Sequence, residues 1–118
     1  MVTMINDELQ KEFIEFVIGE FDKLGKLFYE KNRQYATTEP LANFRAGSLL
    51  HYGFANYASM FEEAKSYARK HIAQVYGSKQ DITTPKVDES LRDIAVYSAI
   101  MLFMHKKYME DGFGGGND

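Results

Sequence analysis

The chain of 118 residues contains no cysteine and only two prolines. The lack of cysteine excludes disulfides, thiolate zinc sites and a cysteine nucleophile, and it fits a reducing compartment. Because proline interrupts helices, a chain with only two prolines has long stretches that a helix can occupy unbroken.

Long apolar runs and a strong charge of one sign are also missing. No segment approaches the roughly 20 apolar residues of a membrane-spanning helix, and the first residues lack the basic and then apolar run of a secretory signal. The chain carries 14 Lys+Arg and 17 Asp+Glu, a net charge of −3, which argues against general binding to nucleic acid. We therefore expect a cytoplasmic protein.

The length predicts a single domain. A chain of this size buries roughly two-thirds of its surface on folding, enough for one continuous core. We place a single helical domain over residues 1–111 and a flexible Gly-rich tail over residues 112–118, where three glycines follow one another.

The spacing of the apolar residues predicts an all-α bundle of about four helices. Over residues 6–33 they recur every three or four positions, which places them on one stripe of a long helix with Asn6 or Asp7 as its N-cap. Pro40 favours the start of a second, shorter helix at Leu41.

Glycine and proline mark the third and fourth helices. We expect a turn near Gly53, followed by a third helix that stops at Gly77. Thr84 is the expected N-cap and Pro85 the first residue of the last helix, which extends to about Glu110. Strand-like alternation is absent.

The last helix is apolar around nearly its whole circumference over residues 94–104. Because a small four-helix domain covers only one side of such a helix, we expect a homo-oligomer, either a dimer or a tetramer, with Tyr97, Ile100 and Met104 at the interface. The alternative is a central helix that the other three helices wrap within a monomer.

Two carboxylates of the last helix have the spacing of a cation site. Glu89 and Asp93 lie one turn apart and are able to grip one divalent cation, Mg²⁺ or Mn²⁺. In the third helix Asn56, Glu63 and Lys70 line one border of the apolar face, and we expect Glu63 to converge with the other two acids. The structural alternative is that the acids simply favour the positive end of the helix dipole.

The three histidines show no zinc signature, because none is paired with another at i, i+4. His51 and His105 are isolated in the sequence. His71 lies within the apolar face of the third helix, where it is either a core histidine or a contact to a phosphate or a base.

Four short segments of the chain resemble small all-helical proteins of phages and prophages. They are residues 31–37 (KNRQYAT), 41–44 (LANF), 70–72 (KHI) and 88–90 (DES), the last followed by Asp93 and Tyr97. These segments look related to the nucleotide modification associated domain and, more distantly, to MazG-type all-α nucleotide pyrophosphohydrolases. The resemblance covers roughly residues 28–102 and implies a compact MazG-like bundle in the cytoplasm of an infected or lysogenic host cell.

The distant resemblance implies a Mg²⁺-dependent cut between the α- and β-phosphates of a nucleoside triphosphate. Glu89 and Asp93 match the acidic motif of the last helix, and Glu63 is the matching ligand from the facing helix. MazG-type enzymes carry two glutamates three residues apart on that helix, whereas Lys65 and Ser66 follow Glu63 here.

The same resemblance implies a set of substrate contacts. Basic residues would hold phosphate, and an amide with an aromatic ring would hold the base or sugar. The matching positions are Lys31, Arg45 and Lys70 for phosphate, Asn43 with Tyr35 or Phe44 for the base or sugar, and His71 beside Lys70.

The sequence assigns no catalytic residue and leaves open whether the protein is an enzyme. Its first functional interpretation is a phage or prophage protein that binds or hydrolyses a nucleotide in a metal-dependent way. The alternatives are a non-catalytic oligomeric interaction protein of a phage and, third, a DNA-associated accessory protein.

Overall fold

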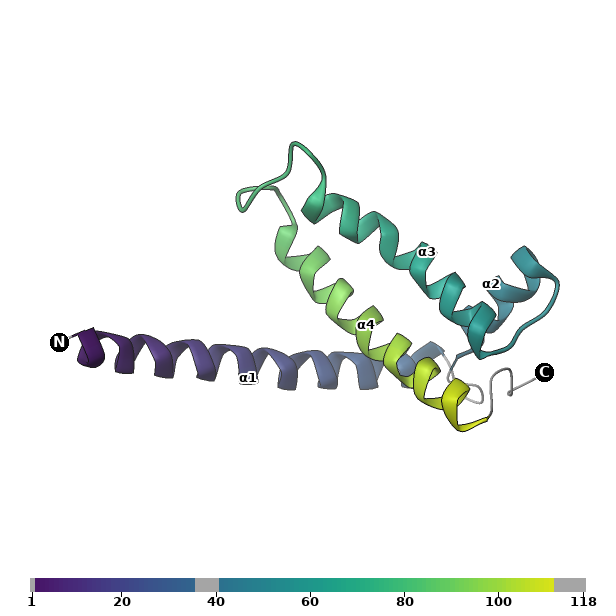
Figure 1. Ribbon diagram of the computed structural model, residues 1–118, viewed down its shortest axis with the longest axis horizontal. Coiled ribbons are helices and arrows are strands. Elements are labelled where there is room, and N and C mark those ends of the chain that lie inside the picture. Colours follow the sequence, from purple (N-terminus) through teal and green to yellow (C-terminus); the bar gives the residue numbers. More distant parts are fainter. Residues whose placement is uncertain (1, 36–40, 112–118) are drawn as a thin grey trace. The chain divides into compact units, whose positions relative to one another are not determined.

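The computed structural model describes residues 2–35 and 41–111, and the protein is built there from helices joined by short loops (Figure 1). Side chains are described for residues 7–33 and 41–111. The helices are α1 (Val2–Tyr35), α2 (Ala42–Tyr52), α3 (Tyr57–Tyr76) and α4 (Val87–Glu110), and these ranges contain no strand. The predicted all-α fold with four helices is confirmed.

The chain divides into two compact units, Met1–Thr37 and Thr38–Asp118. The first unit contains α1 and the second contains α2, α3 and α4. The single domain over residues 1–111 stays a prediction, and the expected tail over residues 112–118 lies outside the described residues. Within the described ranges, no helix combines the length and the apolar character needed to cross a membrane.

Helix α1 runs for 34 residues without interruption. It begins at Val2, so the predicted N-cap at Asn6 or Asp7 is wrong. No glycine or proline lies between Val2 and Asn6, so nothing in the backbone stops the helix from extending toward the N-terminus. Its end at Tyr35 agrees with the break expected before Pro40, although residues 36–40 themselves lie outside the described ranges.

In the second unit, α3 and α4 form a helical hairpin, and α2 packs against α3 (Figure 1). The core lies where these helices meet. Its small Ala64 lets the neighbouring helices approach closely, and Met60 and Met104 are fully buried. The buried cluster consists of Leu41, Phe44, Met60, Ala64 and Met104.

The predicted interface residues of α4 take part in this core. Met104 belongs to the buried cluster, and Tyr97 and Ile100 pack against it. The second unit therefore covers much of this face of α4 from within the chain, as in the alternative of a central, wrapped helix. That Tyr97, Ile100 and Met104 also contact a partner stays a prediction.

Two capping residues shape the connection between α2 and α3. Gly53 ends α2 with a φ of 84°, a left-handed conformation that glycine adopts without steric cost. Asn56 then caps α3: its side chain accepts a hydrogen bond from the Ser59 amide at 2.8 Å, and the Ser59 hydroxyl accepts one from the Asn56 amide at 2.9 Å. Asn56 is thus the N-cap of α3, and that it also lines the apolar border of this helix stays a prediction.

The stop at Gly77 is confirmed, and close approach of the backbone accounts for it. A Cβ at this position would lie 2.7 Å from the carbonyl oxygen of Ala73. The start of α4 differs from its prediction, because Thr84 does not cap the helix. Its hydroxyl accepts a hydrogen bond from the Asp81 amide at 2.9 Å, which closes a separate turn, and α4 begins at Val87.

Substitution of a buried methionine tests the core described above. Met60→Ala removes a side chain with no exposed surface and leaves a cavity, so we expect a loss of about 2–5 kcal/mol in unfolding free energy. Met109 on α4 is 54% exposed, and Met109→Ala is the matched control, with an expected change within about 0.5 kcal/mol. Urea unfolding followed by circular dichroism measures both. Equal effects of the two substitutions would contradict the described core.

Candidate functional site

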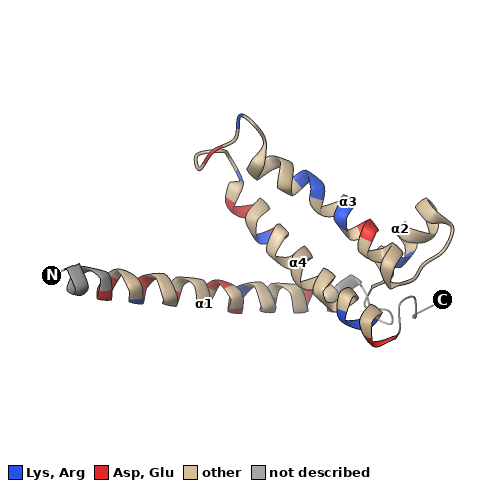
Figure 2. Ribbon diagram, viewed as in Figure 1, with Lys and Arg blue, Asp and Glu red and all other residues tan. Residues whose placement is uncertain are grey.

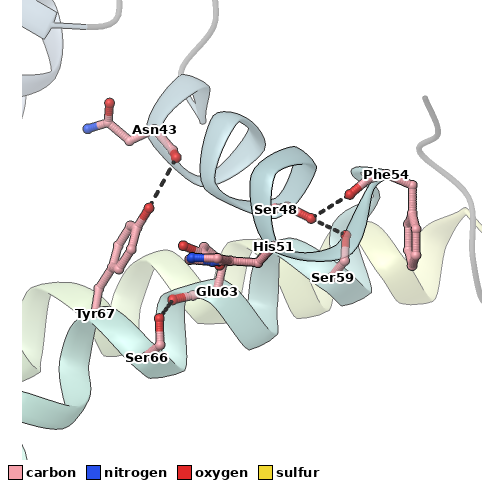
Figure 3. Close-up of polar contacts among 8 residues, drawn as sticks. All are labelled: Asn43, Ser48, His51, Phe54, Ser59, Glu63, Ser66 and Tyr67. Carbon is pink, nitrogen blue, oxygen red and sulfur yellow. Dashed lines mark hydrogen bonds and ion pairs between the residues drawn. The ribbon is translucent and has the colours of Figure 1, made fainter.

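A buried carboxylate lies between α2 and α3. Glu63 on α3 is only 1% exposed, and its Oε1 lies 2.7 Å from Nδ1 of His51 on α2 (Figure 3). Its second oxygen, Oε2, is buried without a hydrogen-bond partner among the described residues. Because an unpaired buried charge is costly, the contact with His51 holds α2 against α3 at this point.

Gly47 makes room for that carboxylate. A Cβ at Gly47 would lie 2.8 Å from Cδ of Glu63 and still closer to Glu63 Oε2 and to the hydroxyl of Tyr67. That hydroxyl donates to the backbone carbonyl of Asn43 at 3.3 Å, so it spans from α3 to the first turn of α2 (Figure 3). Position 47 therefore requires glycine, because a side chain there would prevent α2 from lying this close to α3.

A second polar contact joins the other end of α2 to α3. Ser48 is fully buried, and its hydroxyl lies 2.7 Å from the carbonyl oxygen of Phe54 and 2.6 Å from the hydroxyl of Ser59 (Figure 3). Ser59, which forms a hydrogen bond with Ser48, is thus also the residue that completes the capping box of α3. These bonds satisfy a buried hydroxyl and fix the turn between the two helices.

The ionisation of Glu63 and Tyr67 follows from these contacts. The hydrogen bond with His51 lowers the pKa of Glu63; burial opposes that shift, and the nearby Tyr67 hydroxyl adds to it. Burial raises the pKa of Tyr67 to about 12, and the Glu63 carboxylate contributes. Near neutral pH the site therefore contains an ionised acceptor beside a protonated phenol.

An open hollow of about 430 Å³ lies next to this polar cluster. Three aromatic rings border it: Phe44 lies 5.4 Å from Tyr67 and 6.4 Å from Tyr97, measured between ring centroids. The hollow is lined by Asn43, Phe44, Ala46, Gly47, Leu50, Tyr67 and Tyr97. Its volume is comparable to that of small-molecule sites, but the hollow is open to solvent and would enclose only part of a ligand.

His71 and Asp93 extend the aromatic cluster. The imidazole of His71 stacks on Tyr97 with a centroid distance of 6.0 Å, and its Nδ1 lies 3.5 Å from Oδ2 of Asp93. Burial raises the pKa of Tyr97, and the charge of Asp93 adds to the effect. His71 on α3 therefore contacts two side chains of α4, the ring of Tyr97 and the carboxylate of Asp93.

The predicted metal ligands have different surroundings. Glu63 is buried against His51, Asp93 pairs with His71, and Glu89 is exposed on α4. Within residues 7–33 and 41–111, no group of three or more histidine, aspartate and glutamate side chains is arranged to hold a metal ion. A site for Mg²⁺ or Mn²⁺ stays a prediction.

The predicted substrate residues are partly brought together. Asn43 and Phe44 line the hollow, and His71 stacks on Tyr97, which also lines it. Arg45 on α2 is half-buried and Lys70 on α3 is exposed; neither lines the hollow. Lys31 belongs to the first unit, and the side chain of Tyr35 lies outside the described residues.

Sequence reasoning missed the contact between His51 and Glu63 and the role of Gly47. His51 looked isolated because its partner is 12 residues away, on another helix. Glycine within the short second helix, where it costs up to about 1 kcal/mol, was the available signal of a close approach. Comparisons with protein-family models, with curated proteins and with solved structures found no match to this chain.

The close approach at Gly47 predicts the effect of a small substitution. Gly47→Ala gains at most about 1 kcal/mol of helix propensity but forces a methyl group into the Glu63 carboxylate, which costs about 1–3 kcal/mol. We expect a net loss of stability in thermal unfolding. The control is Gly25→Ala in α1, where a Cβ meets nothing within 4 Å and should stabilise the helix. A stabilised Gly47→Ala protein would contradict the packing described here.

The lowered pKa of Glu63 predicts a pH dependence. A carboxyl whose folded pKa lies below its usual value of 4.5 adds stability above that value and loses it as the pH falls through the folded pKa. The difference in unfolding free energy between the wild type and Glu63→Gln should therefore shrink between pH 6 and pH 3. Glu62→Gln, at an exposed neighbouring position, is the control and should show little difference at either pH. A wild-type advantage over Glu63→Gln that is equal at both values would rule out this account.

Proposed function

We propose that the protein binds a nucleotide in the hollow beside α2, with the base stacked against the half-buried rings of Tyr67 and Tyr97. The observation that carries this proposal is the gathering of Asn43, Phe44, Tyr67 and Tyr97 around one open hollow. Stacking on an aromatic side chain is worth about 1–3 kcal/mol per base and tolerates every base. An asparagine amide both donates and accepts, so Asn43 is suited to the polar edge of a base or to a sugar hydroxyl.

In this proposal, basic side chains outside the hollow bind the phosphates of the nucleotide. Arg45 on α2 and Lys70 on α3 are the candidates in the second unit. Lys31 lies in the first unit, and its contact with phosphate stays a prediction from the sequence. Charge-assisted bonds from such side chains to phosphate oxygens are stronger than neutral hydrogen bonds. In this proposal the rings and Asn43 hold the nucleoside, and the basic residues hold its charged end.

The phage or prophage origin and the MazG-like activity are supported by the resemblance of the short sequence segments. Hydrolysis of that kind requires Mg²⁺ or Mn²⁺ held by carboxylates. Glu89 and Asp93 lie one turn apart on α4, whereas the Glu63 carboxylate contacts His51. The proposal is therefore nucleotide binding, with metal-dependent hydrolysis as a second step to be tested separately.

The second candidate function is that of a non-catalytic interaction protein of a phage. Apolar side chains on α1 favour it, because several of them are largely exposed: Phe13 is 62%, Phe16 is 64% and Phe21 is 65% exposed. Large exposed apolar surfaces in soluble proteins are typical of contacts with other chains. The two candidates differ in whether the hollow binds a small molecule.

Calorimetric titration with nucleoside triphosphates, with and without Mg²⁺, tests the first candidate. Asn43→Ala should weaken binding by about 1–3 kcal/mol through the loss of a hydrogen bond, with little change in melting temperature because Asn43 is exposed. Ser78→Ala is the matched control, since Ser78 is an exposed polar residue of the second unit and does not line the hollow. Pyrophosphate release in the same samples reports hydrolysis.

Failure of the wild type to bind any nucleoside triphosphate at millimolar concentration, with metal present, would reject the nucleotide proposal. Equal weakening by Asn43→Ala and Ser78→Ala would reject the hollow as the binding site.

A further inference from the structure

Five apolar residues of α1 follow the spacing of a helix that packs against another helix. Ile14, Phe21 and Phe28 recur every seven residues, and Val17 and Leu24 lie between them at steps of three and four. This repeat of 3.5 residues is typical of the contact line between two paired helices. Phe21 is 65%, Ile14 is 45% and Phe28 is 42% exposed.

A helix that forms a unit by itself cannot bury its own side chains. Because α1 is the only helix of the first unit, cover for these residues has to come from outside that unit. Side chains three and four residues apart on one helix contact each other only along the surface of that helix. Burying exposed apolar side chains stabilises the protein only when a second surface excludes water from them.

Acidic and basic residues both occur along α1 (Figure 2), but their numbers differ between its two halves. Residues 7–20 contain five acids and one lysine, a net charge of −4, whereas residues 22–33 contain four basic residues and two acids, a net charge of +2. The two acids of the second half are held within the helix: Asp22 lies 3.1 Å from Lys26, and Glu30 lies 3.2 Å from Arg33.

We propose that α1 pairs with α1 of a second copy of this chain, in antiparallel orientation. In that arrangement the acidic half of each helix lies beside the basic half of the other, and the helix dipoles oppose each other favourably. A parallel pair would place like charges side by side over the same length. Residues 7–33 span about 40 Å of helix, long enough for a continuous contact line.

Charge reversal tests the pairing without touching the apolar residues. Lys23→Glu with Lys31→Glu makes both halves of α1 acidic, and Glu8→Lys with Glu12→Lys and Glu15→Lys makes both halves basic. Each variant alone should self-associate more weakly than the wild type, by about tenfold or more at low salt. An equimolar mixture of the two variants should associate again, because each half then faces an opposite charge.

The matched control for the variant with two lysines replaced changes the same amount of charge elsewhere. Arg69→Glu with Lys79→Glu alters two exposed basic residues of the second unit and should leave self-association unchanged. Sedimentation equilibrium measures the mass of each sample against the 13.6 kDa of one chain. Circular dichroism checks that each variant keeps its helices.

Fluorescence energy transfer between two labelled copies of the chain measures whether the two α1 helices lie antiparallel or parallel. Since the chain has no cysteine, Gln10→Cys and Asn32→Cys each give a single labelling site, and about 33 Å of helix separates the two positions. An antiparallel pair gives strong transfer between a copy labelled at 10 and one labelled at 32, and weak transfer between two copies labelled at 10. A parallel pair gives the reverse.

Three results would overturn the proposal, and none depends on nucleotide binding. A wild-type protein that stays monomeric at micromolar concentration would mean that the second unit or a different protein covers α1. A dimer that ignores the charge reversals would form through another surface, such as α4. Strong transfer only between identically labelled copies would show a parallel pair.

Discussion

The buried carboxylate of Glu63 is the contact on which the arrangement of the second unit depends. Helix α2 has only 11 residues, too few to be stable in isolation, so its place is set by what it contacts on α3. His51 meets the Glu63 carboxylate at 2.7 Å, and Ser48 is tied to Ser59 at 2.6 Å. Because an unpaired buried carboxylate costs several kcal/mol, any movement of α2 that withdraws His51 is opposed.

The same constraint shapes the hollow. The carboxylate and the Tyr67 hydroxyl occupy the space where a side chain at position 47 would lie, so Gly47 is required for the two helices to meet. Tyr67 then reaches the carbonyl of Asn43, which fixes the first turn of α2 and with it the ring of Phe44. The contacts that stabilise the fold therefore also position the aromatic rings that we propose as the nucleotide site.

The sequence predicted the helices well because their apolar residues keep the helical period and because glycine marks the ends of α2 and α3. It missed the start of α4, where Thr84 bonds to the Asp81 amide of its own turn and does not cap the helix. At the site, Asn43 and Phe44 were predicted as a pair, since they are adjacent in the sequence. The contact between His51 and Glu63 could not be predicted, because local periodicity says nothing about which side chains of two different helices meet.

We propose above that the hollow beside α2 binds a nucleotide. A titration of the ¹⁵N-labelled protein with a nucleoside triphosphate, followed by the backbone amide resonances, tests it most directly. If a nucleotide binds there, saturable shifts are expected at Asn43, Phe44, Gly47 and Tyr67, which line the hollow, with much smaller shifts in the loop around Lys79. No saturable shift, or shifts confined to residues outside the hollow, would contradict it.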